Sequence, residues 1–362
     1  MQTLAVKYRP KSFDDVVEQT AVKEILREQL RSKTYKNSYL FTGGAGTGKT
    51  TCARIFANEL NEGKGQPIEI DAASNNGVEN VRSIIDQAKF KSLDGAHKVY
   101  IIDECHMLST GAWNAMLKLL EEPPAQTIFI MCTTDPQKIP ATILSRVQRF
   151  DFQRLTYESI VDRLTKIMQQ ERQLAFDKLN EEDPTEHASM TADSAGYYDW
   201  DPNALGYIAK LADGGMRDAI TLLDKCLSYS YEIALSNVVA ALGVADYQTM
   251  IKLTNAVYER QAAEAVEIIE QIHRSGVDLK QFVKNYLQFI LDTKKYQMYQ
   301  SFEYLSMPPV EDLQTWLDQF NDAAGFLNNA LQELIKLQEM IKWETAPKAL
   351  IEASFIYYCE VL

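Results

Sequence analysis

Cysteine is scarce in this sequence of 362 residues, and its spacing argues against two kinds of site. The count is odd, no Cys-x-x-Cys pair occurs, and long gaps separate Cys52, Cys105, Cys132, Cys226 and Cys359. A zinc site needs closely spaced ligands and a disulfide framework usually has an even count, so neither is expected. We predict buried, reduced thiols, as in a reducing cytoplasm.

Long apolar runs are absent as well. No uninterrupted run approaches the roughly 18 residues that a membrane-spanning helix needs. The basic first segment, MQTLAVKYRPKSF, lacks the apolar core of a signal peptide. With 46% hydrophobic and 24% charged residues, the composition is that of a folded protein of two or three domains. We therefore expect a cytoplasmic protein without a membrane partner.

A basic excess, the usual mark of a DNA-binding protein, is also missing, since the formal net charge is −13. The charge is unevenly distributed. Residues 1–154 hold 20 Lys and Arg against 18 Asp and Glu, whereas residues 155–362 hold 17 against 32. This asymmetry indicates separate domains with separate roles. The near-neutral first part is the better candidate for contact with DNA.

Hydrophobic patterning predicts an α/β domain followed by helices. Short apolar runs predict strands at 37–42, 67–70, 99–102 and 127–132. Helical spacing between them predicts helices at 51–60, 78–90 and 113–120. This alternation is typical of a parallel sheet. After residue 154 we expect helices, beginning with 156–173, 203–212 and 217–229, and we interpret the acidic segment 177–198 as a flexible surface insertion.

The strongest motif is a phosphate-binding loop. The pattern G-x-x-x-x-G-K-[ST] lies between a predicted strand and a predicted helix, in the run Gly43, Gly44, Ala45, Gly46, Thr47, Gly48, Lys49, Thr50 and Thr51. Backbone N–H groups of such a loop surround phosphate oxygens, and the helix N-terminus adds positive potential. Lys49 would reach the β and γ phosphates, and the Thr50 hydroxyl would bind Mg²⁺. The alternative, a chance glycine-rich turn, is disfavoured by the flanking elements.

Two adjacent carboxylates end the third predicted strand. Asp103 and Glu104 follow VYII, at the edge of the sheet where ligands bind in open α/β folds. Asp103 would hold Mg²⁺ through water, and Glu104 would polarise a water that attacks the γ-phosphate. A strand that ends in Asp-Glu is otherwise often a solvated loop. Its pairing with the phosphate loop favours the catalytic interpretation.

Three more polar residues are weaker candidates. Thr133 and Thr134 follow the fourth strand and would place hydroxyls beside the same crevice. Arg146, in ILSRVQRF, has no acidic partner in its immediate sequence and could stabilise phosphate charge in its own or an adjacent subunit. For the threonines the alternative is a structural role, and for Arg146 it is an ordinary surface position.

Other conspicuous residues are assigned to structure. His97 and His106 each lie alone near a strand with no nucleophile beside them, so we expect no catalytic role. The apolar stripe of 113–120 has helical spacing and predicts core packing rather than a cofactor site.

Seven motifs in order resemble one family. They are YRPKSFDDVVEQ, GGAGTGKTT, IEIDAASNNGVENVR, VYIIDECHMLS, AWNAMLKLLEEPP, CTTDPQKIPATILSRVQRFDF and ADGGMRDAITLLD. This series closely resembles the AAA+ clamp-loader ATPases, specifically the bacterial DNA polymerase III gamma/tau subunits. The dense similarity runs from Lys7 to Asp224, and beyond it only helical character and TAPKALIEASFIYY agree.

The resemblance implies roles for individual residues. Tyr8, Arg9 and Pro10 match the segment that lines the adenine pocket. Arg146 matches the arginine that acts on ATP of the neighbouring subunit, and Arg217 matches the sensor-2 arginine. Thr134 falls at sensor 1, with Thr133 as a competing assignment. Primer–template phosphates would face the helix start that contains Asn75, Asn76 and Arg82.

The sequence departs from the family pattern at three places. Val147 replaces the cysteine after the arginine, which we expect to change packing only. Between Leu60 and Pro67, NEGKGQ stands where the family usually has a four-cysteine zinc module. No zinc is therefore expected, and a divergent lineage such as a phage is indicated. The 177–198 insertion in the second domain has no assigned role.

The resemblance thus predicts three domains and a function. The expected domains are an AAA+ nucleotide domain at 1–154, a helical lid at 155–235 and a helical collar for oligomerisation at 236–362. Such a subunit would use ATP and Mg²⁺ to open a sliding clamp, within a ring of loader subunits that the family makes pentameric. Primed DNA would trigger hydrolysis and release the closed clamp. The alternatives are another AAA+ DNA machine, for branch migration or helicase loading, and a ring scaffold that does not hydrolyse ATP.

Overall fold

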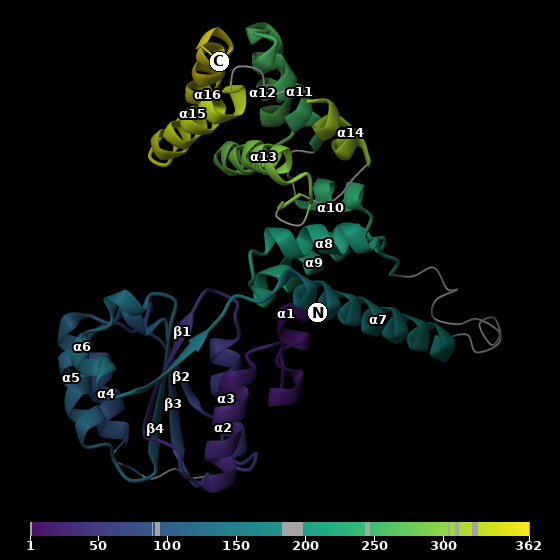
Figure 1. The fold of residues 1–362 in the computed structure, drawn as a ribbon. Coiled ribbons are helices and arrows are strands. Elements are labelled where there is room, and N and C mark those ends of the chain that lie inside the picture. Colours follow the sequence, from purple (N-terminus) through teal and green to yellow (C-terminus); the bar gives the residue numbers. More distant parts are fainter. Residues whose placement is uncertain are drawn as a thin grey trace. The chain divides into compact units, whose positions relative to one another are not determined.

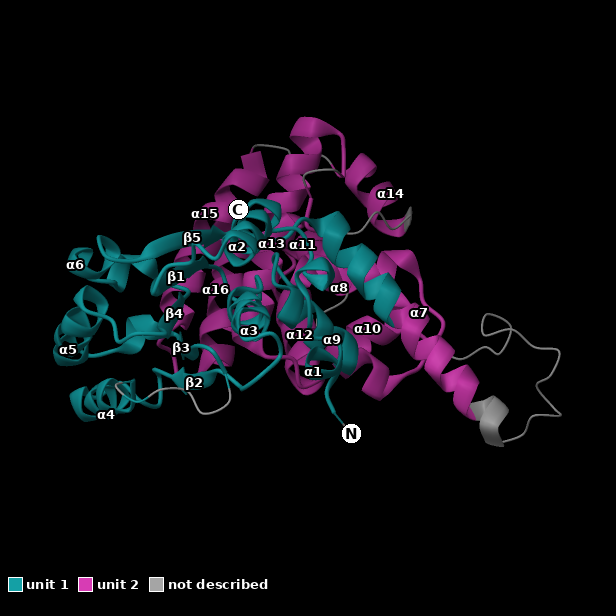
Figure 2. Cartoon of the chain, turned by 90° about the horizontal axis from the view of Figure 1, so that it is seen from below, with its two compact units in different colours: residues 1–167, 212–224 teal, residues 168–211, 225–362 magenta. Residues whose placement is uncertain are grey.

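The chain is described from a computed structural model covering residues 2–88, 90, 95–182, 198–242, 247–302, 305–307, 311–320 and 325–361. It divides into two compact units. Unit 1 comprises residues 1–167 and 212–224, and unit 2 comprises 168–211 and 225–362 (Figure 2). These units do not test the boundaries of the three predicted domains, which stay a prediction.

Unit 1 is built on a five-stranded parallel sheet of order β2-β3-β4-β1-β5, which confirms the predicted α/β class. The strands are β1 (Ser38–Gly43), β2 (Ile68–Asp71), β3 (Lys98–Asp103), β4 (Thr127–Thr133) and β5 (Gln148–Phe152). The sequence analysis missed β5. Because β4 pairs with both β1 and β3, the carboxyl ends of these three strands meet at one edge.

Helices cover both faces of the sheet because successive strand side chains point to opposite sides. Tyr39 and Phe41 pack toward α2 (Thr20–Ser32) and α3 (Lys49–Leu60). Leu40, between them, packs toward the other face, which is covered by α4 (Val78–Ala88) and α5 (Thr110–Glu121) (Figure 1). The expected core stripe of α5 is confirmed, since Trp113 and Met116 are buried in this second layer.

The remaining elements of unit 1 are short, apart from parts of two long helices. The short ones are α1 (Leu4–Lys7), η1 (Phe13–Asp15), η2 (Cys105–Met107), η3 (Pro136–Lys138) and α6 (Ala141–Leu144). The first part of α7 (Tyr157–Glu182) and most of α9 (Met216–Tyr229) complete the unit. The predicted insertion at 177–198 is wrong at its start, since residues 177–182 continue α7. The segment 183–197 lies outside the described residues.

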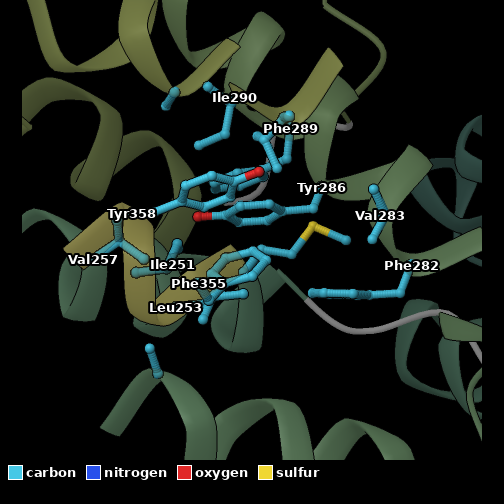
Figure 3. Packing of buried hydrophobic residues seen from close by; sticks show 14 of the residues in the cluster. Ile251, Leu253, Val257, Phe282, Val283, Tyr286, Phe289, Ile290, Phe355 and Tyr358 are labelled. Carbon is cyan, nitrogen blue, oxygen red and sulfur yellow. The ribbon is translucent and has the colours of Figure 1, made fainter. Parts of the chain in front are cut away.

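Unit 2 is helical in its described part, as the sequence predicts. Its helices include α8 (Pro202–Leu211), α10 (Leu235–Leu242), α11 (Tyr247–Tyr258), α12 (Ala262–Arg274), α13 (Leu279–Tyr299), α14 (Glu311–Gln319), α15 (Phe326–Ile341) and α16 (Pro347–Val361). Aromatic side chains form much of its core. Figure 3 shows Tyr286 of α13 beside Phe355 and Tyr358 of α16, and the ring centroids of Tyr286 and Phe355 are 5.6 Å apart.

Three structural findings bear on the expectations from composition. All five cysteines are free and buried, which confirms the prediction of buried thiols. In the described part of the chain, no helix combines the length and apolar character that crossing a bilayer requires. Among the same residues, no three His, Cys, Asp or Glu side chains converge on a position that would hold a metal ion.

Candidate nucleotide site

The phosphate loop between β1 and α3 is held in a shape that glycine alone accommodates. Gly43 has φ +147°, and a Cβ at this position would lie 2.3 Å from the backbone oxygen of Phe152. Gly46 has φ +70° and faces the backbone of Gly215. These positive φ angles and close approaches explain why the motif requires glycines here. They also tie the loop to β5 and to the residues that precede α9.

Lys49, the first residue of α3, points back into the loop. Its Nζ donates hydrogen bonds to the backbone oxygens of Gly43 (2.8 Å) and Gly44 (2.7 Å). The residue is buried, and this burial lowers the pKa of the lysine although Glu104 and Asp103 oppose the shift. The ammonium group is therefore positioned inside the loop, where phosphate oxygens would compete with the two carbonyls for its protons.

Thr50 and Asp103 meet across the top of the sheet. The Thr50 hydroxyl donates to Oδ2 of Asp103 at 2.8 Å, because α3 begins just after the phosphate loop and Asp103 ends the nearby β3. A hydroxyl and a carboxylate are hard oxygen ligands of the kind that Mg²⁺ prefers. The two residues that the sequence assigned to magnesium therefore fit it by donor chemistry and proximity.

Glu104 stands in a left-handed backbone conformation, with φ 46°, directly after β3. Its Oε2 accepts a hydrogen bond from the Thr134 hydroxyl at 2.9 Å and lies 3.3 Å from Nδ1 of His106. Thr133 instead contacts His106, through Oγ1 at 3.1 Å from Nδ1. Thr134 therefore touches the carboxylate directly, whereas Thr133 reaches it through a histidine that the sequence analysis assigned to structure.

A cavity of about 400 Å³ lies in unit 1, and its lining includes Asp103 and Glu104 but neither Thr133 nor Thr134, nor Gly43 and Gly44 at the start of the loop. Most of the predicted nucleotide-binding residues line it, namely Tyr8, Arg9, Pro10, Ala45, Gly46, Thr47, Gly48, Lys49, Thr50, Thr51, Asp103, Glu104 and Arg217. Segments far apart in sequence thus converge on one hollow. Its size is in the range of small-molecule and cofactor sites, and the convergent polar groups suit a phosphorylated ligand.

Arg146, which follows α6, is not among the residues that line the cavity. Its Nε and Nη2 donate to Oε1 of Glu121 at 3.0 and 2.7 Å, and Nη1 donates to the Thr142 oxygen at 2.6 Å. No acidic residue lies in the sequence immediately around Arg146, and the fold brings one from 25 residues away. The Arg146 side chain is about one-third exposed to solvent.

The three residues expected to face DNA also lie away from the cavity. Asn75 donates from Nδ2 to the backbone oxygen of Asp71 at 3.1 Å. Asn76, before α4, and Arg82, within its first half, are both exposed. The arrangement is consistent with a solvent-facing helix start.

Sequence reasoning missed several residues of the site. Arg163, in α7, lines the cavity and donates from Nη2 to the backbone oxygen of Tyr8 at 3.1 Å. The backbone N–H of Met216, at the start of α9, donates to the oxygen of Gly46 at 3.0 Å. Arg163 lies outside the seven motifs, and Met216, although it lies within ADGGMRDAITLLD, contributes only its backbone, which a side-chain pattern does not reveal. The amphipathic pattern of α7 left Arg163 looking like an ordinary polar position.

Arg163→Ala is expected to weaken ATP binding about fivefold. The variant removes the donor to Tyr8 and so loosens the segment Tyr8–Pro10, and a fivefold change corresponds to about 1 kcal/mol, part of the free energy that a hydrogen bond from a charged group contributes. Titration with a fluorescent ATP analogue measures the change. Lys166→Ala is the control, since it removes a positive charge from an exposed position of the same helix outside the cavity. Equal affinities of the two variants would contradict the assigned role.

Family models match three successive parts of the chain. Residues 68–156 match DNA polymerase III, delta subunit, and residues 195–232 match DNA polymerase III clamp loader subunit, ATPase lid domain. Residues 233–356 match DNA polymerase III subunits gamma and tau domain III. Together the three matches extend from the sheet to the last helix.

Individual relatives cover more of the chain. The DNA polymerase III subunit tau of Bacillus subtilis is 35% identical over 99% of this chain and 63% of its own length. The subunit gamma of Buchnera aphidicola subsp. Schizaphis graminum is 31% identical over 80% of this chain and 79% of its own length. Among solved structures, the RuvB Holliday junction branch migration motor of Thermotoga maritima aligns with a TM-score of 0.48, at 19% identity over 69% of this chain and 79% of its own. The chain spans less than two thirds of the length of the tau relatives from Bacillus subtilis and Salmonella typhimurium.

Proposed function

The chain belongs to the DNA polymerase III gamma/tau family, and from this membership we propose that it is an ATP-hydrolysing subunit of a sliding-clamp loader. The observation that carries the proposal is the cavity, at which the phosphate loop, Asp103, Glu104 and Arg217 converge. Each of these groups suits one part of ATP hydrolysis. A protein that only occupied a place in a ring would have no use for the full set.

ATP would bind with its base against Tyr8, Arg9 and Pro10 and its phosphates along the loop. Lys49 would exchange the Gly43 and Gly44 carbonyls for phosphate oxygens, at little cost because its ammonium is already inside the loop. Arg217, at the cavity wall, would add positive charge on the opposite side. Thr50 and Asp103 would hold Mg²⁺, which when bound neutralises phosphate charge.

Hydrolysis needs a water aligned with the γ-phosphate. Glu104 would accept a proton from this water or polarise it, and Thr134 holds the carboxylate through one oxygen. Arg146 lies outside the cavity of its own subunit, so its charge would serve the ATP of a neighbour. Activity would then require a ring of loader subunits, for which the family suggests a pentamer.

Clamp opening and DNA binding complete the proposal. ATP binding would let the ring grip and open a sliding clamp, and primed DNA would trigger hydrolysis and release the clamp closed. Asn75, Asn76 and Arg82 would contact primer–template phosphates, since the latter two are exposed and positive or polar. The acidic excess after residue 154 would then belong to parts of the chain that do not touch DNA.

ATP turnover with different DNAs tests this function. We expect turnover to rise at least tenfold when partner subunits, clamp and primed DNA are all present, because a neighbour's arginine completes the site only in the assembled ring. Four-way junction DNA and unprimed DNA are the matched controls. Stimulation by four-way junctions alone would favour a branch-migration motor, and no turnover under any condition would favour a scaffold.

A further inference from the structure

The carboxylate of Glu104 is held on one side only. Thr134 donates to Oε2 through its hydroxyl at 2.9 Å and through its backbone N–H at 3.4 Å. His106 approaches the same oxygen at 3.3 Å. Within the residues that the structure describes, all polar contacts of this carboxylate involve Oε2. Oε1 therefore remains for a water molecule.

The surroundings of His106 favour one of the two positions for the ring proton. Nδ1 lies between Oε2 of Glu104 at 3.3 Å and Oγ1 of Thr133 at 3.1 Å. An unprotonated Nδ1 would direct a lone pair at a carboxylate oxygen, which is repulsive, whereas an Nδ1–H can donate to either neighbour. The geometry thus favours the tautomer that donates toward Glu104.

His106 is enclosed by buried neighbours. It belongs to η2, whose first residue, Cys105, is fully buried in the core layer beneath α4 and α5. On its other side Thr133 is also fully buried, and its hydroxyl oxygen accepts the backbone N–H of Asp135 at 3.0 Å. The imidazole is thus fixed between the end of β4 and the carboxylate, with its side chain only 12% exposed.

We infer that His106 is a positioning residue for Glu104: together with Thr134 it fixes Oε2, so that Oε1 faces the attacking water. The two threonines then have different roles in holding the carboxylate. Thr134 acts on the carboxylate directly, and Thr133 acts through His106. This inference rests on the proposed ATPase function, and it gives a role to a histidine that the sequence pattern assigned to structure.

Substitutions at His106 that keep or move the donor test the inference. His106→Leu removes the donor and is expected to lower kcat for ATP about tenfold, because an unrestrained carboxylate is aligned for a smaller fraction of the time. The KM for ATP and the affinity for a fluorescent ATP analogue should stay within about twofold. His106→Asn places its amide N–H₂ where Nδ1 stands and should restore most of kcat, whereas His106→Gln places it where Nε2 stands and should not.

A double-mutant cycle separates this role from a merely structural one. In a Glu104→Gln background, His106→Leu should cause no further loss of kcat, because the group that it positions is already disabled. A second tenfold loss would overturn the inference, as would equal kcat values of the Asn and Gln variants. If Glu104→Gln itself turned over ATP at the unaltered rate, the proposed function would fail instead. Should the Leu variant fail to fold, the comparison of the two polar variants decides the question.

Discussion

Arg146→Ala is expected to lower DNA-stimulated ATP hydrolysis about 10³-fold while ATP affinity stays within about twofold. The arginine does not line the cavity of its own subunit, so its loss leaves ATP binding there unchanged. A guanidinium supplied by a neighbour stabilises the charge that develops on the transferred phosphoryl group, and such arginines contribute roughly 10³ or more to turnover.

The measurement is steady-state hydrolysis by the assembled loader, with clamp and primed DNA, beside an equilibrium titration of ATP. Arg149→Ala is the matched control, since it removes the same charge from β5 at an exposed position paired with Asp151. Mixing Arg146→Ala chains with unaltered ones should lower turnover in proportion to the number of interfaces that lack the arginine. Retained stimulation in rings made wholly of the variant would exclude a role in the neighbouring site.

Glu104→Gln is expected to abolish turnover almost completely, by about 10³-fold, without weakening ATP binding. The amide is nearly isosteric and can still contact Thr134, but it cannot accept a proton from water. The neighbouring Thr50–Asp103 pair at 2.8 Å is untouched, so the groups that would hold the metal remain. The variant should therefore trap the ATP-bound state.

Single-turnover hydrolysis and clamp-binding assays distinguish this outcome from simple damage. The trapped variant should bind the clamp in the presence of ATP as well as the unaltered chain does, and it should fail to release it on primed DNA. Glu24→Gln, an exposed position on α2, is the control for loss of one negative charge. A parallel loss of ATP affinity would show that Glu104 acts in binding rather than in catalysis.

Local patterns predicted the parts of the site that depend on consecutive residues. The phosphate loop can be recognised in the sequence because a tight turn between a buried strand and a helix requires glycines such as Gly43 and Gly46. Asp103 and Glu104 can be recognised because they directly follow an apolar strand segment, VYII. Both depend on short stretches of chain, and the structure brings both to one cavity.

Contacts between residues far apart in the sequence could not be predicted from local sequence patterns. The partner of Arg146 is Glu121, which the fold brings close from the end of α5. Arg163 meets the backbone of Tyr8 across 155 residues of sequence. His106 looked isolated because Thr133, which reaches it from the end of β4, lies 27 residues away in the sequence, and the direction of the nearby Glu104 carboxylate was not predictable. Side-chain pairing of this kind follows from the order of strands, which a single sequence does not reveal.

The missed strand, β5, has a similar explanation. Its residues QRFDF alternate between exposed and buried, whereas the four predicted strands were recognised from apolar runs. β5 lies at the edge of the sheet beside β1, so part of it faces solvent and polar residues are tolerated there. Its position still matters, since the backbone of Phe152 forces glycine at position 43.

The hydrogen bond from Met216 to Gly46 makes the phosphate loop and the start of α9 a thermodynamically linked pair. The first N–H groups of a helix have no acceptor within the helix, so this one depends on where the Gly46 carbonyl points. A ligand that turns the Gly46 carbonyl away breaks this hydrogen bond and destabilises the present position of the α9 start by about 1 kcal/mol. A ligand that keeps the carbonyl in place stabilises the loop and the start of α9 together. By reciprocity, anything that shifts the start of α9 changes the affinity of the loop for its ligand by the same factor.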